Sequence, residues 1–208
     1  MKKYKFYLFD FDGTLLDTSK CLYYVFKEAF KETHVDIKEE DVELLSRIPL
    51  SEGYKKMNGK KQYVNVFSKR IKEALNEDES IKYTSKFPEI DKFLNYINNH
   101  SLNVGIVTSN DTEHVIKVLK YLNIDPTIFK VIVGSDKCQG IKPSPEPILT
   151  ALKECNYNDS KDEVIYVGDS FNDCLAGKNA HIDYVLLDRK GNSDSEFPTI
   201  SNLLELFI

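Results

Sequence analysis

The stretch YLFDFDGTLLDT, which runs from Tyr7 to Thr18, places Asp10 and Asp12 at the end of an apolar run and follows them with a glycine. Two carboxylates this close repel each other, and both would be more stable in water than beside aromatic side chains. Taken alone, the pattern favours a turn whose aspartates bind the backbone. A bound cation would offset the repulsion, and paired carboxyl groups are also what nucleophilic and proton-transfer chemistry requires.

Polar residues follow the other apolar runs of the chain, either directly, in the next loop or one turn later. These residues are Thr108, Ser109, Asn110, Lys142, Asp169 and Asp173. In an open parallel sheet, ligands bind at the carboxyl ends of the strands. We therefore expect these side chains to converge with Asp10 and Asp12 in one crevice. Clustered carboxylates offer oxygen ligands only, which suits a hard cation, and Mg²⁺ is the usual ion where phosphate is handled.

The elements that must position these residues alternate between strands and helices. Residues 4–9 are apolar on both faces, as in a strand buried in a parallel sheet. After residue 87, helical patterns such as PEIDKFLNYINNH alternate with the apolar runs LNVGIVT, KVIVG, EVIYVGD and DYVLL, and SNLLELF predicts a final helix. Alternating strands and helices predict right-handed crossovers and an α/β fold with a doubly wound parallel sheet.

The segment from residue 16 to residue 83 interrupts this alternation with helical patterns only. We expect residues 1–15 and 84–208 to form an α/β core and residues 16–83 to form an inserted all-helical domain.

Composition and charge exclude several classes of function. The net charge is −5, and no basic run is long enough for a nucleic-acid footprint. The four cysteines are scattered, without metal-ligand spacing, which argues against a zinc site or a disulfide scaffold and favours the reducing cytoplasm. The apolar run near the start is too short for a signal sequence and is broken by Asp10, and no stretch approaches the length of a membrane span.

Four motifs of the chain resemble, in the expected order, those of the haloacid dehalogenase-like hydrolase superfamily: DFDGT, IVTS, KPSPEPI and VGDSFND. The resemblance covers the whole chain. The inserted segment resembles the helical cap of the phosphoglycolate phosphatase and β-phosphoglucomutase branch. The resemblance of the whole chain implies a Rossmann-like catalytic core. Any one motif alone would be weak, but separate explanations as turns, caps or surface residues do not account for all four lying at strand ends.

The resemblance implies a role for each acid in the motifs. Asp10 matches the nucleophile that forms an aspartyl-phosphate, and Asp12 matches the general acid and base. Asp10, the main-chain carbonyl of Asp12 and Asp169 match metal ligands. Asp173 lies nearby, either as a further metal ligand or as a residue that binds and orients the ligands.

The resemblance also implies a phosphate-binding set. Thr108 matches the hydroxyl that binds phosphoryl oxygens, and Lys142 matches the cation that stabilises charge in the transition state. Ser109 and Asn110 add donors beside them. In the inserted segment, Arg47 stands where similar proteins have a glycine in a loop that reaches the active site. Arg47 is therefore a candidate substrate contact, and its alternative, a solvated charge on a helix face, stays open.

A second departure from the family pattern lies in the segment AGKNAHIDYVLL. His181 stands where many similar proteins have a glycine at a helix end. We expect the exchange to alter the turn and not the chemistry.

Together these features predict a Mg²⁺-dependent phosphatase acting on a small phosphorylated metabolite, as a monomer or homodimer without nucleic-acid or membrane partners. Three alternatives stay open. A phosphomutase of the β-phosphoglucomutase type would share the core residues, and a non-catalytic protein that binds phosphorylated metabolites would show no turnover. A phosphonate hydrolase would need a lysine in the inserted segment that forms a Schiff base, and Lys55 and Lys56 are the candidates.

Overall fold

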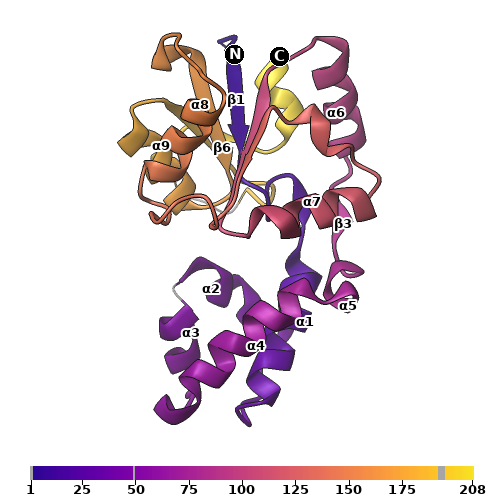
Figure 1. Cartoon of the computed structure of the whole chain (residues 1–208), viewed down its shortest axis with the longest axis vertical. Helices are drawn as coiled ribbons and strands as arrows, with labels where there is room; N and C mark the ends of the chain where they lie inside the picture. Colours follow the sequence, from indigo (N-terminus) through magenta and orange to yellow (C-terminus); the bar gives the residue numbers. More distant parts are fainter. Residues whose placement is uncertain (1, 49, 192–194) are drawn as a thin grey trace. The chain divides into compact units, whose positions relative to one another are not determined.

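The computed structural model describes residues 2–48, 50–191 and 195–208, and the chain forms two compact units (Figure 1). One combines residues 1–16 with residues 86–208, and the other is residues 17–85. The chain passes between them through β2 (Leu16–Asp17) and β3 (Ser85–Lys86), two short strands that pair with each other. Strands this short leave no periodic pattern, and the sequence did not predict them.

The α/β unit is built on a six-stranded sheet with the order β5-β4-β1-β6-β7-β8. Every pairing in it is parallel, which confirms the predicted fold class. The strands are β1 (Phe6–Phe9), β4 (Val104–Val107), β5 (Val131–Val133), β6 (Val164–Gly168), β7 (Asp183–Leu187) and β8 (Thr199–Ile200). The central strands β1, β4 and β6 are buried along their whole length, because helices cover both faces of the sheet.

The four main helices of this unit are α6 (Ile90–Asn99), α7 (Thr112–Tyr121), α8 (Glu146–Glu154) and α9 (Phe171–Ala180), and they lie on both sides of the sheet (Figure 1). Successive side chains of β1 alternate between the two layers. Phe6 and Leu8 pack in the cluster formed with α8 and α9. Phe9 contacts Phe93 of α6, with ring centroids 5.2 Å apart.

The helical unit has a separate apolar core. Its helices are α1 (Ser19–Lys31), α2 (Val42–Arg47), α3 (Leu50–Lys56), α4 (Val64–Asn76) and α5 (Asp78–Ile81), with 3-10 turns at Glu39–Asp41 and Lys61–Tyr63. Phe30, Tyr54 and Phe67 pack against one another at its centre, with centroid separations of 4.6 to 5.7 Å. Burying side chains of this size contributes about 1.5–3 kcal/mol each.

The C-terminal segment differs from the sequence prediction. A short strand, β8, which was not expected, precedes it, and the helix predicted for SNLLELF is a 3-10 helix at Leu203–Phe207. Asn202 caps this helix by accepting a hydrogen bond from the amide of Leu204 (2.9 Å). The segment is too short to propagate an α-helix, so tertiary packing decides its conformation.

His181 ends α9 in the left-handed conformation, with φ 58° and ψ 47°. This is the backbone geometry that glycine adopts most easily at a helix end. His181 therefore adopts the conformation that is typical of glycine at this place, and the expected alteration of the turn is not seen in the backbone. Among the residues that the structure describes, none of the helices is both long and apolar enough to cross a membrane.

Candidate active site

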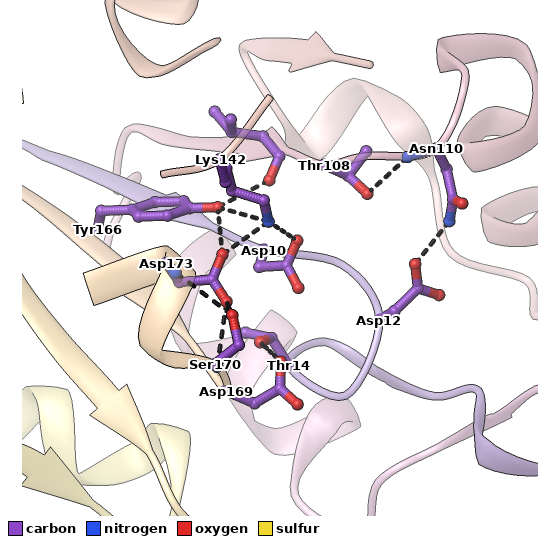
Figure 2. A network of polar contacts seen from close by, with 11 residues as sticks. Asp10, Asp12, Thr14, Thr108, Asn110, Lys142, Tyr166, Asp169, Ser170 and Asp173 are labelled. Atoms are coloured by element: carbon purple, nitrogen blue, oxygen red, sulfur yellow. Dashed lines mark hydrogen bonds and ion pairs between the residues drawn. The ribbon is translucent and has the colours of Figure 1, made fainter. Parts of the chain in front are cut away.

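The predicted residues meet at the carboxyl edge of the sheet, where β4, β1 and β6 lie side by side. Asp10 follows β1, Thr108 follows β4 and Asp169 follows β6. Figure 2 shows their side chains close to those of Lys142, Asp173 and Tyr166, where Lys142 links Asp10, Asp173 and Tyr166 in one polar network. The parallel topology produces this convergence, because it brings the ends of strands that are distant in sequence to one edge.

Lys142 is the centre of the network. Its Nζ donates to Oδ1 of Asp10 (2.6 Å), to Oδ1 of Asp173 (2.6 Å) and to Oη of Tyr166 (3.2 Å). The Lys142 side chain is 9% exposed, and those of Asp10 and Asp173 are 8% and 1% exposed. An ammonium group has three hydrogens to donate, which matches the number of these oxygens.

The burial of these charges changes their proton affinities. Burial raises the pKa of Asp10 well above its usual range, while Lys142 acts in the opposite direction. Burial disfavours the charged form of Lys142, but Asp10 and Asp173 outweigh this effect and raise its pKa well above the usual value. Lys142 is thus a firmly charged cation beside Asp10, which suits the stabilisation of negative charge on a phosphoryl group.

Asp173 has hydrogen-bond partners on both carboxylate oxygens. Oδ1 accepts from Lys142, and Oδ2 accepts from the amide and the hydroxyl of Ser170. Ser170 and Asp173 form a capping box at the start of α9. Gly168 makes this possible, since a Cβ there would lie 2.3 Å from the Cβ of Asp173. These contacts indicate that Asp173 positions Lys142, and they make a role for Asp173 as a metal ligand less favoured.

Asp12 lies apart from the lysine, on the side of the network that Asn110 occupies (Figure 2). The side-chain amide of Asn110 donates to Oδ2 of Asp12 (2.6 Å). Thr108, which is buried, accepts through Oγ1 from the backbone amide of Asn110 (3.2 Å). The two aspartates of the first motif therefore have separate environments, one beside a cation and one beside an amide.

Oxygen atoms of Asp10, Asp169 and Asp173 lie within 4.8 Å of one another, close enough to surround one ion. Burial, and next the charge of Asp173, raises the pKa of Asp169 to about 6. A cation would relieve this repulsion, and carboxylate oxygens are the ligands that Mg²⁺ prefers. The donor set therefore fits the expected ion, with Asp10 and Asp169 as the carboxylates best placed to hold it.

Two further predicted residues, Ser109 and Arg47, have no described contact with this network. Ser109 is exposed beside Thr108. Arg47 ends α2 in the helical unit, and its side chain lies outside the described part of the structure.

Two contacts of the site were not predicted from the sequence. Tyr166 of β6 accepts from Lys142 and donates to the carbonyl oxygen of Val107 (2.9 Å). Thr14, which is buried, places Oγ1 3.4 Å from Oδ1 of Asp169. A signal for Tyr166 was present, because a tyrosine within a buried aliphatic strand requires a partner for its hydroxyl.

The chain is similar in sequence to known hydrolases. A family model for haloacid dehalogenase-like hydrolases matches residues 7–187. The pyrophosphatase PpaX of Listeria innocua is 30% identical over 176 residues, covering 83% of this chain and 78% of the relative. PpaX of Halalkalibacterium halodurans is 29% identical over 177 residues, covering 84% of this chain and 79% of the relative.

Among solved structures, a hydrolase of the haloacid dehalogenase-like family from Streptococcus pneumoniae, SP0104, aligns with a TM-score of 0.79 and 22% identity. The alignment covers 100% of this chain and 92% of the other. At this identity the likeness concerns the fold.

Proposed function

The chain belongs to the haloacid dehalogenase-like hydrolases, and we propose that it is a Mg²⁺-dependent phosphatase that transfers the phosphoryl group of a small metabolite to Asp10 and then to water. That it hydrolyses phosphate esters follows from its relatives. The identity of the metal, the identity of the substrate and the roles of individual residues are what we propose here.

One observation carries the proposal: the ammonium group of Lys142 lies 2.6 Å from a carboxylate oxygen of Asp10 at the carboxyl end of the central strand. A lysine in this place compensates the charge of the nucleophile and of an arriving phosphoryl group. A turn that merely used its aspartates to bind the backbone would not require a buried cation from a loop 132 residues away.

In the first step, Oδ2 of Asp10 attacks phosphorus while Oδ1 stays on Lys142. The new bond joins Oδ2 to phosphorus, and the bond from phosphorus to the leaving oxygen breaks. Asp12 gives a proton to that oxygen, so the alcohol leaves neutral. Asn110 holds the Asp12 carboxyl group for this transfer through its 2.6 Å contact.

In the second step, Asp12 is a carboxylate and accepts a proton from a water molecule. The oxygen of that water attacks phosphorus, the bond from Oδ2 of Asp10 to phosphorus breaks, and inorganic phosphate leaves. Asp12 is protonated again, and Asp10 returns as a carboxylate. Both residues therefore regain their starting states in each cycle.

The carboxylates of Asp10 and Asp169 and the main-chain carbonyl of Asp12 are the groups that we propose for Mg²⁺. When bound there, the ion would neutralise part of the charge on the carboxylates and on the phosphoryl oxygens. Thr108, Asn110 and Lys142 would hold the same phosphoryl oxygens from the other side of the site.

The identity of the substrate is the next question. Because the relatives are named as pyrophosphatases, pyrophosphate is the first compound to test, followed by phosphoglycolate and sugar phosphates. We propose that the helical unit acts as a cap that selects among such compounds, with Arg47 as one contact. The four cysteines are free thiols, which supports a cytoplasmic location.

The test is a substrate panel measured by phosphate release with Mg²⁺ present and after chelation with EDTA. We expect release that stops on chelation and returns with Mg²⁺, and inhibition by Ca²⁺, whose larger and looser shell would misplace Asp10. Asp159→Asn is a control, because Asp159 is exposed and pairs with Lys5 outside the site.

Full turnover after thorough chelation would refute the metal dependence. Isomerisation of a sugar phosphate without net release would favour the mutase, and binding without turnover of any compound would favour the non-catalytic alternative.

A further inference from the structure

Arg189 lies just beyond the carboxyl end of β7, at the same edge of the sheet as the candidate active site. Its guanidinium group contacts two separate segments of the α/β unit. Nη1 donates to the carbonyl of Gly13 (2.6 Å), and Nη2 donates to the carbonyl of Thr14 (2.8 Å). Nε and Nη2 also donate to Oε1 of Glu89, at 3.0 and 2.6 Å.

The contact with Glu89 is a largely buried ion pair. The Arg189 side chain is 18% exposed and that of Glu89 is 7% exposed. The guanidinium also stacks on Phe87, with its central carbon 3.6 Å from the ring centroid. A buried charge is costly unless its partners fit it closely, so an arginine placed here must be held in one geometry.

The two carbonyls that Arg189 binds belong to the loop that carries the aspartates. Inside this loop, the backbone hydrogen bonds use the carbonyls of Phe11 and Leu16. The carbonyls of Gly13 and Thr14 are used by Arg189. One planar group therefore fixes the segment that directly follows Asp12.

Small shifts of this segment would reach the reacting groups. Gly13 has φ 73°, and a Cβ on it would lie 2.4 Å from Oδ2 of Asp169, so the loop and Asp169 are in close contact. Thr14 contacts Asp169 through its hydroxyl. Asp12, one residue before Gly13, is held on its other side by Asn110.

We propose that Arg189 is a positioning residue: it holds the carbonyls of Gly13 and Thr14 so that Asp12 stays in place to transfer a proton. This inference rests on the proposed phosphatase function and adds a residue outside the four sequence motifs. The guanidinium fork matters here more than its charge, because a lysine cannot reach three acceptors in the same plane.

Arg189→Lys tests the proposal, with kcat/KM measured for phenyl phosphate and for 2,4-dinitrophenyl phosphate. Dinitrophenolate leaves without a proton, whereas phenolate needs one, and kcat/KM includes the step in which the leaving group departs. We expect a loss of about 10- to 100-fold for phenyl phosphate, typical of a misplaced catalytic group. The value for dinitrophenyl phosphate should stay near wild type.

Arg70→Lys is the matched control, because Arg70 is 19% exposed and pairs with two glutamates in the helical unit. It should leave the ratio of the two kcat/KM values unchanged. Equal losses for both esters in Arg189→Lys, or no loss, would overturn the proposal. If Arg189→Lys does not fold, Glu89→Gln should give a smaller change of the ratio in the same direction, and an unchanged ratio would overturn the proposal.

Hydrogen exchange separates this inference from the proposed function. The amides of Gly13, Leu15 and Leu16 are hydrogen-bonded within the loop, and their exchange in the resting protein needs no substrate. We expect faster exchange of these amides in Arg189→Lys than in wild type or Arg70→Lys. If the wild-type protein hydrolyses neither ester, the proposed function fails, and unchanged exchange at these amides would then overturn the role of Arg189 separately.

Discussion

Each unit of the protein contains a cation placed between two carboxylates, but the two networks differ in burial. In the α/β unit, Lys142 lies between Asp10 and Asp173, and these side chains are at most 9% exposed. In the helical unit, Arg70 lies between Glu28 and Glu77, whose side chains are 26% and 36% exposed. Networks of one cation with two carboxylates therefore occur both in the interior and near the surface.

The difference indicates what each network does. Arg70 of α4 joins Glu28 of α1 to Glu77, the residue that follows α4, and so ties the two long helices together. Partly exposed pairs of this kind contribute about 0–1 kcal/mol. Burying Lys142 with two carboxylates costs solvation free energy that stability alone does not require. We therefore assign the buried network to chemistry and the exposed one to local stability.

Asp10→Asn should cause the largest change, because an amide is a poor nucleophile of nearly the same shape. We expect turnover to fall below detection while substrate still binds. Phosphate release and calorimetric binding, measured on the same preparation, check this. Residual turnover above that of an unrelated protein purified in the same way would argue against Asp10 as the nucleophile.

Asp12→Asn should lower kcat/KM by roughly 10²- to 10⁴-fold, the range of general acid catalysis. The loss should be smaller for esters whose leaving group needs no proton. Rates for a series of aryl phosphates with different leaving-group acidity test this. A loss that is constant across the series would count against Asp12 as the acid.

Lys142→Ala should lower kcat/KM by a common factor of about 10²–10³ for every ester, because each presents the same phosphoryl group. It should also lower the free energy of unfolding by about 3–5 kcal/mol, since two buried carboxylates lose their cation. Arg70→Ala should cost only about 1 kcal/mol and leave kcat/KM unchanged. Denaturant unfolding of both variants makes the comparison, and equal costs would remove the distinction between the networks.

Glu77→Gln should have the smallest effect, and that effect should depend on pH. The hydrogen bond from Arg70 lowers the pKa of Glu77. Its contribution to stability is therefore present above the unfolded pKa of glutamate, about 4.3, and is lost as pH falls through the lower folded pKa. The melting temperature of Glu77→Gln should lie slightly below wild type at pH 7 and approach it in acid. A difference that is constant with pH would contradict this assignment.

The sequence predicted the α/β unit well because its pattern is strong. Buried runs such as VGIV and VIYVG are apolar on both faces, and each is followed by a polar residue at the edge where the site lies. Lys142 could be expected in the same crevice as Asp10 from its loop after a strand, but its role as the cation beside the nucleophile came only from the family resemblance, since a single lysine before a proline carries no local signal.

Three features could not be derived from local patterns. The strands β2 and β3 are too short to show a period. Leu203–Phe207 has helical spacing but forms a 3-10 helix and not an α-helix, because packing decides the conformation of so short a segment. Arg189 was missed because its partners are two backbone carbonyls and a glutamate 100 residues away, and no sequence pattern records such contacts.

The most direct test of the account is to trap the phosphorylated enzyme. An acyl phosphate is reduced by borohydride to the alcohol, so protein quenched in acid during turnover would carry homoserine in place of the phosphorylated aspartate. Trypsin releases the peptide Phe6–Lys20, which contains three aspartates that fragment spectra distinguish. The account predicts homoserine at position 10, only when a hydrolysed ester is present. Homoserine at another position, or none at all while phosphate is being released, would contradict it.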